Sequence, residues 1–208
     1  MKKRIIFDLD NTIIIWEKHF ISALEETIAL FNVEVDVKKI DDIIESMEIK
    51  YKKLSKELLL DEINNSCNLN LNIDFVNTLF EKQGKLAKED KEVIDTLSYL
   101  NNKYELVILS NYYKEVQEKR LIKAGIRHFF KEIYSGEEFL KPDHGAFYNA
   151  MGDKKIEECL MIGDKIDTDI KGAMDIGMDV IAVDYFNKIK DNDLYSVVRN
   201  FSDLKKLL

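Results

Sequence analysis

The feature that most constrains this chain is an apolar segment near its start that ends directly in two acids. Residues 5–7 read Ile-Ile-Phe, β-forming residues without polar alternation, which is typical of a strand buried on both faces of a parallel sheet. Asp8 and Asp10 follow at once. Open α/β sheets bind ligands at the carboxyl ends of their strands, so both acids are candidates for chemistry, although a simple turn explains this segment equally well.

Strands and helices alternate in the second half of the chain. Four further apolar segments predict strands, at residues 106–109, 132–135, 160–162 and 180–183. Helical spacing lies between them, and Gly125 and Gly177 mark the ends of two helices. We therefore predict an α/β fold, a doubly wound, Rossmann-like parallel sheet with right-handed crossovers.

Residues 15–87 carry helical patterns and no convincing strand. One apolar stripe recurs at helical spacing, at Phe20, Ala23, Leu24, Thr27, Ile28 and Phe31. The segment 64–72 is rich in Asn and predicts a loop between two helices. We expect an α-helical domain at residues 15–87, inserted into an α/β core formed by residues 1–14 and 88–208.

Polar residues follow several of the predicted strands at the point where each strand ends. Ser110 and Asn111 follow one strand, and Asp164 follows another. Because the carboxyl ends of parallel strands share one edge, these residues should converge there with Asp8 and Asp10. Neighbouring carboxylates repel each other unless a cation or a shared proton compensates them. The combination therefore predicts a catalytic or metal-binding crevice rather than three unrelated turns.

Composition narrows the classes of partner. The formal net charge is -8 and no basic stripe with interleaved aromatic residues is present, so nucleic acid is not an expected partner. No secretory signal and no apolar segment of membrane-spanning length is visible. Cys67 and Cys159 are isolated, which favours reduced thiols over a disulfide or a zinc site. We therefore expect a cytoplasmic protein without a membrane partner.

With these motifs the chain resembles the haloacid dehalogenase-like (HAD) hydrolase superfamily, and within it the phosphatases with a helical cap inserted after the first strand. Four motifs carry the resemblance: Asp8-Leu9-Asp10-Asn11-Thr12, Ser110-Asn111, Lys141-Pro142, and Gly163-Asp164 with Asp169. They span the chain in the family's order. The helical segment 15–87 corresponds to the cap.

The resemblance implies a role for each motif residue. Asp8 would be the nucleophile that forms an aspartyl-phosphate, and Asp10 would be the general acid and base. The residues expected to bind the phosphoryl group are Thr12, Ser110, Asn111 and Lys141. The expected cofactor is Mg²⁺, held by Asp8, Asp164 and a backbone carbonyl of Asp10. Asp169 would orient the surroundings of Asp164 or Lys141, and Asp167 is expected to be a solvated acid.

Several residues also have a simpler interpretation. Without the family pattern, Lys141 would be a surface lysine before the chain's only proline, and Ser110 could be a helix N-cap. A basic cluster could meet an anionic substrate or form a solvated helix face, which the pattern favours: Lys50, Lys52, Lys53 and Lys56.

The predicted function is a Mg²⁺-dependent phosphatase that acts on a small phosphorylated metabolite, as a monomer or homodimer. A phosphomutase or phosphotransferase could use the same site with a second hydroxyl in place of water. A haloacid dehalogenase is disfavoured, because dehalogenases resembling this family need no metal and lack an acid at the position of Asp10. A receiver-like signalling module is disfavoured by the long helical insert.

Overall fold

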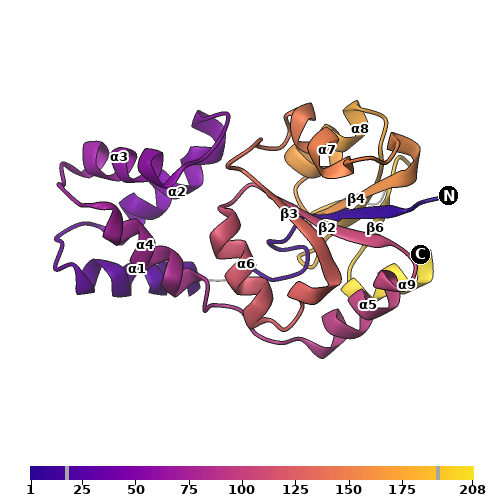
Figure 1. Cartoon of the computed structure of the whole chain (residues 1–208), viewed down its shortest axis with the longest axis horizontal. Coiled ribbons are helices and arrows are strands. Elements are labelled where there is room, and N and C mark those ends of the chain that lie inside the picture. Colours follow the sequence, from indigo (N-terminus) through magenta and orange to yellow (C-terminus); the bar gives the residue numbers. More distant parts are fainter. Residues whose placement is uncertain (17–18, 191–192) are drawn as a thin grey trace.

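A parallel β-sheet forms the centre of the molecule (Figure 1). The computed structural model describes residues 1–16, 19–190 and 193–208, and within them six strands pair in the order β3-β2-β1-β4-β5-β6. All five pairings are parallel. The strands are β1 (Arg4–Phe7), β2 (Glu105–Ser110), β3 (Phe130–Ser135), β4 (Cys159–Gly163), β5 (Asp179–Val183) and β6 (Ser196–Val198). This sheet confirms the predicted α/β class and the five predicted strands.

Helices cover both faces of the sheet, as the unbroken apolar sequence of β1 predicts (Figure 1). Ile5 and Phe7 pack on one face against α5 and α6, whereas Ile6 packs on the opposite face against α7 and α8. These helices are α5 (Lys91–Asn101), α6 (Lys114–Lys123), α7 (His144–Met151) and α8 (Lys171–Asp175). Ile5, Ile6 and Phe7 are fully buried, and each such burial contributes about 1.5–3 kcal/mol.

Among the described residues, four helices lie between β1 and α5 and pack on one another beside the sheet; we call them the helical insert (Figure 1). They are α1 (His19–Leu30), α2 (Val37–Lys50), α3 (Lys56–Cys67) and α4 (Ile73–Gln83). The predicted stripe of α1 faces this packing, with Phe20, Leu24 and Ile28 buried. Asp36 and Ser55 accept backbone hydrogen bonds at the starts of α2 and α3, which is a common N-cap arrangement.

The prediction of a loop over residues 64–72 is only partly correct, because α3 continues to Cys67. The Asn64 side chain donates to the Leu71 carbonyl (3.0 Å) and accepts from the Leu71 N–H (2.8 Å). Asn68 ends the helix in the left-handed conformation that Asn tolerates. The Asn residues therefore close a short connection and do not form a long loop.

The apolar pattern of the sequence does not predict the short elements of the structure. β6 has three residues, too few to show a period. The other short elements are the 3₁₀ turns Arg127–Phe129, Ile156–Glu158 and Phe201–Asp203, the π-helix Ile166–Ile170 and the helix α9 (Leu204–Leu207).

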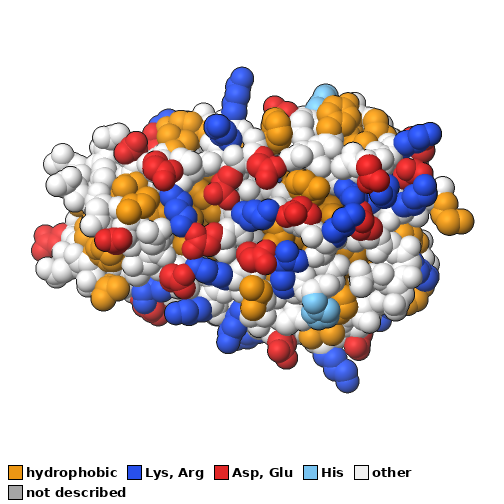
Figure 2. Space-filling view, viewed as in Figure 1, with side chains coloured by type: hydrophobic (Ala, Val, Ile, Leu, Met, Phe, Trp, Pro, Cys, Tyr) orange, Lys and Arg blue, Asp and Glu red, His pale blue; other side chains and the backbone are white. Residues whose placement is uncertain are grey.

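Acidic and basic side chains are interspersed on the face shown in Figure 2. Several ion pairs of the molecule are exposed, such as Lys171 with Asp167 (2.5 Å), and each such pair contributes at most about 1 kcal/mol. Across residues 1–16, 19–190 and 193–208, the helices are too short or too polar to traverse a bilayer.

Asp184, directly after β5, organises the connection to β6. Its buried carboxylate accepts backbone N–H groups of Lys188 (3.0 Å) and Ile189 (2.7 Å). Arg199 adds an ion pair of 2.7 Å. Burial alone would raise the pKa of Asp184, but these donors outweigh it and hold the pKa below its usual value.

We expect Asp184→Asn to lower the free energy of unfolding by about 2 kcal/mol near pH 7, because the ion pair and part of the acceptor set are lost. The native state favours the carboxylate, so the stabilisation is complete above the unfolded pKa of about 3.9 and is lost as the pH falls through the lower folded pKa. Urea unfolding of both proteins across this pH range measures the difference. The exposed Asp175→Asn is the control; a wild-type advantage that does not shrink in acid would contradict the prediction.

Candidate active site

The predicted site residues meet at the carboxyl edge of the sheet. β1 lies between β2 and β4, so the residues that end these three strands are neighbours. A cavity of about 570 Å³ opens there, between the sheet and the helical insert. It is lined by six predicted residues: Asp8, Asp10, Ser110, Asn111, Lys141 and Asp164. The structure therefore brings together side chains that are more than 150 positions apart in the sequence.

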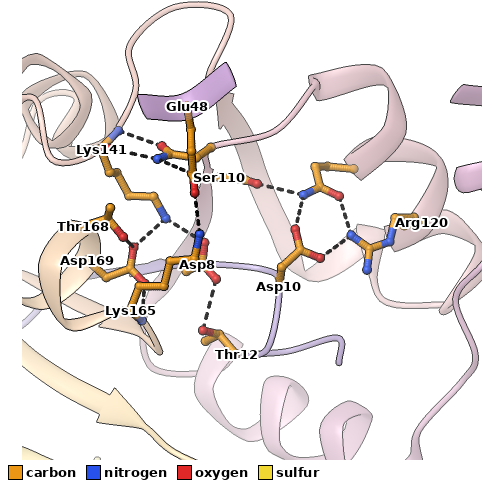
Figure 3. Close-up of polar contacts among 12 residues, drawn as sticks. Asp8, Asp10, Thr12, Glu48, Ser110, Arg120, Lys141, Lys165, Thr168 and Asp169 are labelled. Atoms are coloured by element: carbon orange, nitrogen blue, oxygen red, sulfur yellow. Dashed lines mark hydrogen bonds and ion pairs between the residues drawn. The ribbon is translucent and has the colours of Figure 1, made fainter. Parts of the chain in front are cut away.

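Lys141 occupies the centre of the charge arrangement (Figure 3). Its buried Nζ lies 2.6 Å from a carboxylate oxygen of Asp8 and 2.7 Å from one of Asp169. Burial would lower the pKa of Lys141, but the two carboxylates outweigh this effect and raise it. Lys141 is therefore a fixed cation inside the site, not a surface lysine.

Three carboxylates converge beside this lysine. Asp8, Asp164 and Asp169 each offer an oxygen, and these oxygens lie within 4.8 Å of one another. Burial, with the nearby Asp169, raises the pKa of Asp164 to about 7, and burial also raises the pKa of Asp8 well above its usual value. One ammonium group does not balance the two buried acids and the half-buried Asp164, and carboxylate oxygens are the ligands that Mg²⁺ prefers. The donor set thus fits a divalent cation.

Asp169 reaches the site from the turn after β4. Its second oxygen accepts the backbone N–H of Lys165 (3.0 Å), so both carboxylate oxygens have partners. A Cβ at Gly163 would lie 2.6 Å from the Asp169 Cβ, closer than real atoms approach. Glycine at this position therefore allows Asp169 to reach Lys141.

Thr12 is fully buried and does not line the cavity. Its buried hydroxyl donates to the second oxygen of Asp8 (3.2 Å). The turn that places it has Asn11 at φ 58°, where Asn is tolerated better than most residues. Lys141 and Thr12 together fix the Asp8 carboxylate from two sides (Figure 3).

The side chain of Asn111 holds the backbone of Lys141. Its amide donates to the Lys141 carbonyl (2.9 Å) and accepts the Lys141 N–H (2.7 Å). It also donates to Glu48 of α2 (3.1 Å), and Glu48 forms a 2.7 Å ion pair with Lys165. A residue of the helical insert therefore touches the site, which sequence patterns do not reveal.

Asp10 points away from Lys141, toward α6 (Figure 3). One carboxylate oxygen accepts a hydrogen bond from Arg120 Nη1 (2.5 Å), and the other accepts one from Gln117 Nε2 (2.7 Å). Sequence reasoning missed both partners. A signal existed, because residues 117 and 120 share the buried side of α6 with Leu121, where polar side chains need partners.

Ser110 is not the N-cap of the following helix. α6 begins at Lys114, with Tyr113 at the N-cap position and no side-chain cap hydrogen bond. The Ser110 hydroxyl instead accepts a hydrogen bond from Gln117 Nε2 (2.8 Å).

The basic cluster lies outside the cavity. None of Lys50, Lys52, Lys53 and Lys56 lines it. Lys50 pairs with Glu62 (2.6 Å), and Lys56 pairs with Glu115. The exposed Lys50, Lys52 and Lys53 fit the solvated-face interpretation, whereas Lys56 is half-buried.

A family profile and several individual proteins are similar to this chain. The profile, described as haloacid dehalogenase-like hydrolase, matches residues 5–183. The glyceraldehyde 3-phosphate phosphatase of Methanothermobacter thermautotrophicus is 36% identical over 126 residues, which are 54% of this chain and 55% of the relative. The pyrimidine 5'-nucleotidase PynA of Streptococcus pneumoniae is 25% identical over 209 residues, which cover 86% of this chain and 82% of the relative. The chain thus spans about half the length of the first relative and most of the second.

Solved structures share the whole fold. The HAD-hydrolase YfnB of Bacillus subtilis, bound to magnesium, aligns with a TM-score of 0.77 and 20% identity over 99% of this chain and 98% of that chain. A 2-haloacid dehalogenase of Pseudomonas syringae aligns with a TM-score of 0.76 and 21% identity over 100% of this chain and 98% of that chain. At these identities the likeness shows the fold.

We expect Mg²⁺ to raise the melting temperature of the wild type, by a stabilisation of about 2.7 kcal/mol when the ion is at 100 times its Kd. Asp164→Asn should lose most of this gain, because a charged ligand is removed. The metal-free variant should be at least as stable as the metal-free wild type, because repulsion among the acids falls.

Thermal melts with Mg²⁺ and with chelator measure both effects. Asp167→Asn is the matched control, since its side chain lies at the surface and pairs with Lys171 (2.5 Å). The prediction is contradicted if Asp164→Asn gains as much stability from Mg²⁺ as the control does.

Proposed function

The chain belongs to the haloacid dehalogenase-like hydrolase family, and from this premise we propose that it is a Mg²⁺-dependent phosphatase of small phosphate monoesters. One observation carries the proposal: the Asp8 carboxylate is held between Lys141 and Thr12 at the floor of the cavity, beside Asp164. A fixed, buried carboxylate next to a cation suits a nucleophile that must face an anionic phosphoryl group.

Asp8 would attack the phosphorus atom. A bond forms between its carboxylate oxygen and phosphorus, and the bond from phosphorus to the alcohol oxygen breaks. Lys141 would offset the negative charge on the transferring group, while the Ser110 hydroxyl and backbone N–H groups around Asn111 would bind its oxygens. The product of this step is an aspartyl-phosphate and a free alcohol.

Asp10 would handle the protons in both half-reactions. As an acid it gives a proton to the leaving alcohol oxygen, and as a base it takes a proton from the water that hydrolyses the aspartyl-phosphate. The second step returns Asp8 to its carboxylate and releases phosphate. Asp10 lines the cavity but does not belong to the cluster of acids that contains Asp169. This position suits contact with the alcohol side of the substrate.

Asp8, Asp164 and the Asp10 backbone carbonyl would hold the Mg²⁺ ion, with Asp169 kept as the partner of Lys141. When bound, the ion would relieve the repulsion among these acids and polarise the phosphoryl group. The magnesium in the YfnB structure supports this choice of metal.

The substrate we propose is a phosphorylated metabolite of modest size. The cavity falls in the range of small-molecule sites, and the relatives named above include a glyceraldehyde 3-phosphate phosphatase and a pyrimidine 5'-nucleotidase. On the side of the helical insert the cavity is lined mainly by apolar and acidic residues, among them Asp42, Ile44 and Glu45. Haloacid dehalogenation is not favoured, because Asp10 and Asp164 would have no task in it.

Phosphate release from a panel of phosphorylated metabolites tests the proposal. Release should require Mg²⁺ and stop with chelator. Asp8→Asn should abolish it, and Asp10→Asn should reduce it by about 10²–10⁴-fold, the usual contribution of a general acid. Asp167→Asn is the control variant.

Product analysis separates the alternatives. A phosphatase releases inorganic phosphate, whereas a mutase or phosphotransferase returns the phosphoryl group to a second hydroxyl. Release that survives in Asp8→Asn or in chelator would overturn the proposed mechanism.

A further inference from the structure

We propose that Gln117 and Arg120, two side chains of α6, are positioning residues that hold the Asp10 carboxylate and the Ser110 hydroxyl in fixed orientations at the cavity wall. The inference rests on the proposed function, in which Asp10 moves the protons. Both residues reach the reaction only through these two partners. Neither Gln117 nor Arg120 lines the cavity.

The contacts form one continuous, buried network. Gln117 is fully buried and Arg120 is 1% exposed. Arg120 Nη1 donates to Asp10 (2.5 Å) and to the Gln117 side-chain oxygen (2.8 Å). Gln117 Nε2 donates to the other oxygen of Asp10 (2.7 Å) and to Ser110 Oγ (2.8 Å). Both oxygens of Asp10 are thus fixed by donors from one helix.

The donor and acceptor pattern permits only one arrangement of the Gln117 amide. A guanidinium group has donors and no acceptor, so the amide oxygen must face Arg120. The NH₂ group then faces Asp10 and Ser110. Because Ser110 Oγ accepts one of these hydrogens, its own proton is free to point elsewhere, and Ser110 lines the cavity where a phosphoryl oxygen would lie. Arg120 therefore orients Asp10 directly and Ser110 through Gln117.

The surroundings of Arg120 make the Asp10 contact hard to replace. Its guanidinium lies over the rings of Trp16 (5.6 Å) and Phe20 (5.1 Å), and its buried Nε has no hydrogen-bond partner among the residues that the structure describes. Aromatic faces stabilise a cation but do not neutralise it. A buried guanidinium strongly favours a nearby carboxylate, so the pair keeps Asp10 in one orientation.

Three variants test the network. Arg120→Met keeps the bulk and removes the charge, Gln117→Met removes both amide donors, and Arg120→Lys keeps the charge. Lys123→Gln, an exposed position on the same helix, is the matched control. Circular dichroism and thermal melts identify the variants that fold, and the conclusion can be drawn from either methionine variant.

The readout is the single-turnover rate of alcohol release with enzyme in excess, for two leaving groups. One substrate is the alkyl phosphate that the wild type hydrolyses fastest, and the other is 4-nitrophenyl phosphate. An alkoxide needs a proton from Asp10 to leave, whereas nitrophenolate leaves without one. We expect the methionine variants to lose about 100-fold on the alkyl phosphate and less than about threefold on the aryl phosphate. Arg120→Lys should recover part of the loss.

A purely structural role would lower both rates together, and that result would overturn the inference. So would an increased rate on the alkyl phosphate, which would mean that Arg120 holds Asp10 back from the substrate instead of positioning it for proton transfer. Asp10→Asn separates this inference from the proposed function. If Asp10→Asn lowers the rates for the alkyl and the aryl phosphate equally, the proposed function is wrong. If Asp10→Asn lowers mainly the alkyl rate and the methionine variants do not, only the positioning role is wrong.

Discussion

The ion pairs of Lys141 are the interaction on which the site depends. Its ammonium group lies between the carboxylates of Asp8 and Asp169, deep at the carboxyl edge of the sheet. Without a cation there, three acids could not remain charged so close together in a buried setting. Much of the nearby structure serves to hold this lysine: Asn111 fixes its backbone, and Gly163 leaves room for Asp169 to reach it. The sheet brings these residues together because its strands are parallel and end at one edge.

The fold was largely predictable because its strands are buried on both faces. Such strands read as unbroken apolar segments, and β1 and β4 are clear examples. The site residues at the strand ends were predictable for a related reason, since parallel pairing forces those ends together whatever their separation in sequence. Less could be said of short or polar elements. β6 is too short to show a period, and the side-chain hydrogen bonds of Asn64 turn what reads as a long loop into a helix end with a tight connection.

What the sequence could not supply is the set of partners that reach the site from the helices. Glu48 comes from α2, and its contact with Asn111 depends on how the helical insert packs against the sheet. Gln117 and Arg120 could have been suspected from their helical face, but their partner Asp10 lies about a hundred positions away. Periodicity predicts which side of a helix is buried. It does not predict which carboxylate a buried arginine meets, because that is decided by tertiary packing.

The placement of Glu48 has a consequence for how such an enzyme can diversify. The cavity wall from the helical insert and the wall from the strand ends belong to separate stretches of chain, so residues facing the alcohol side of a substrate can change without altering the phosphate side. Position 48 is an exception, because it links the two walls. Its carboxylate touches Asn111, and Asn111 holds the backbone of Lys141. A substitution at position 48 that is selected for a new substrate would therefore also act on the reaction chemistry, which makes it an unfavourable place for specificity to evolve.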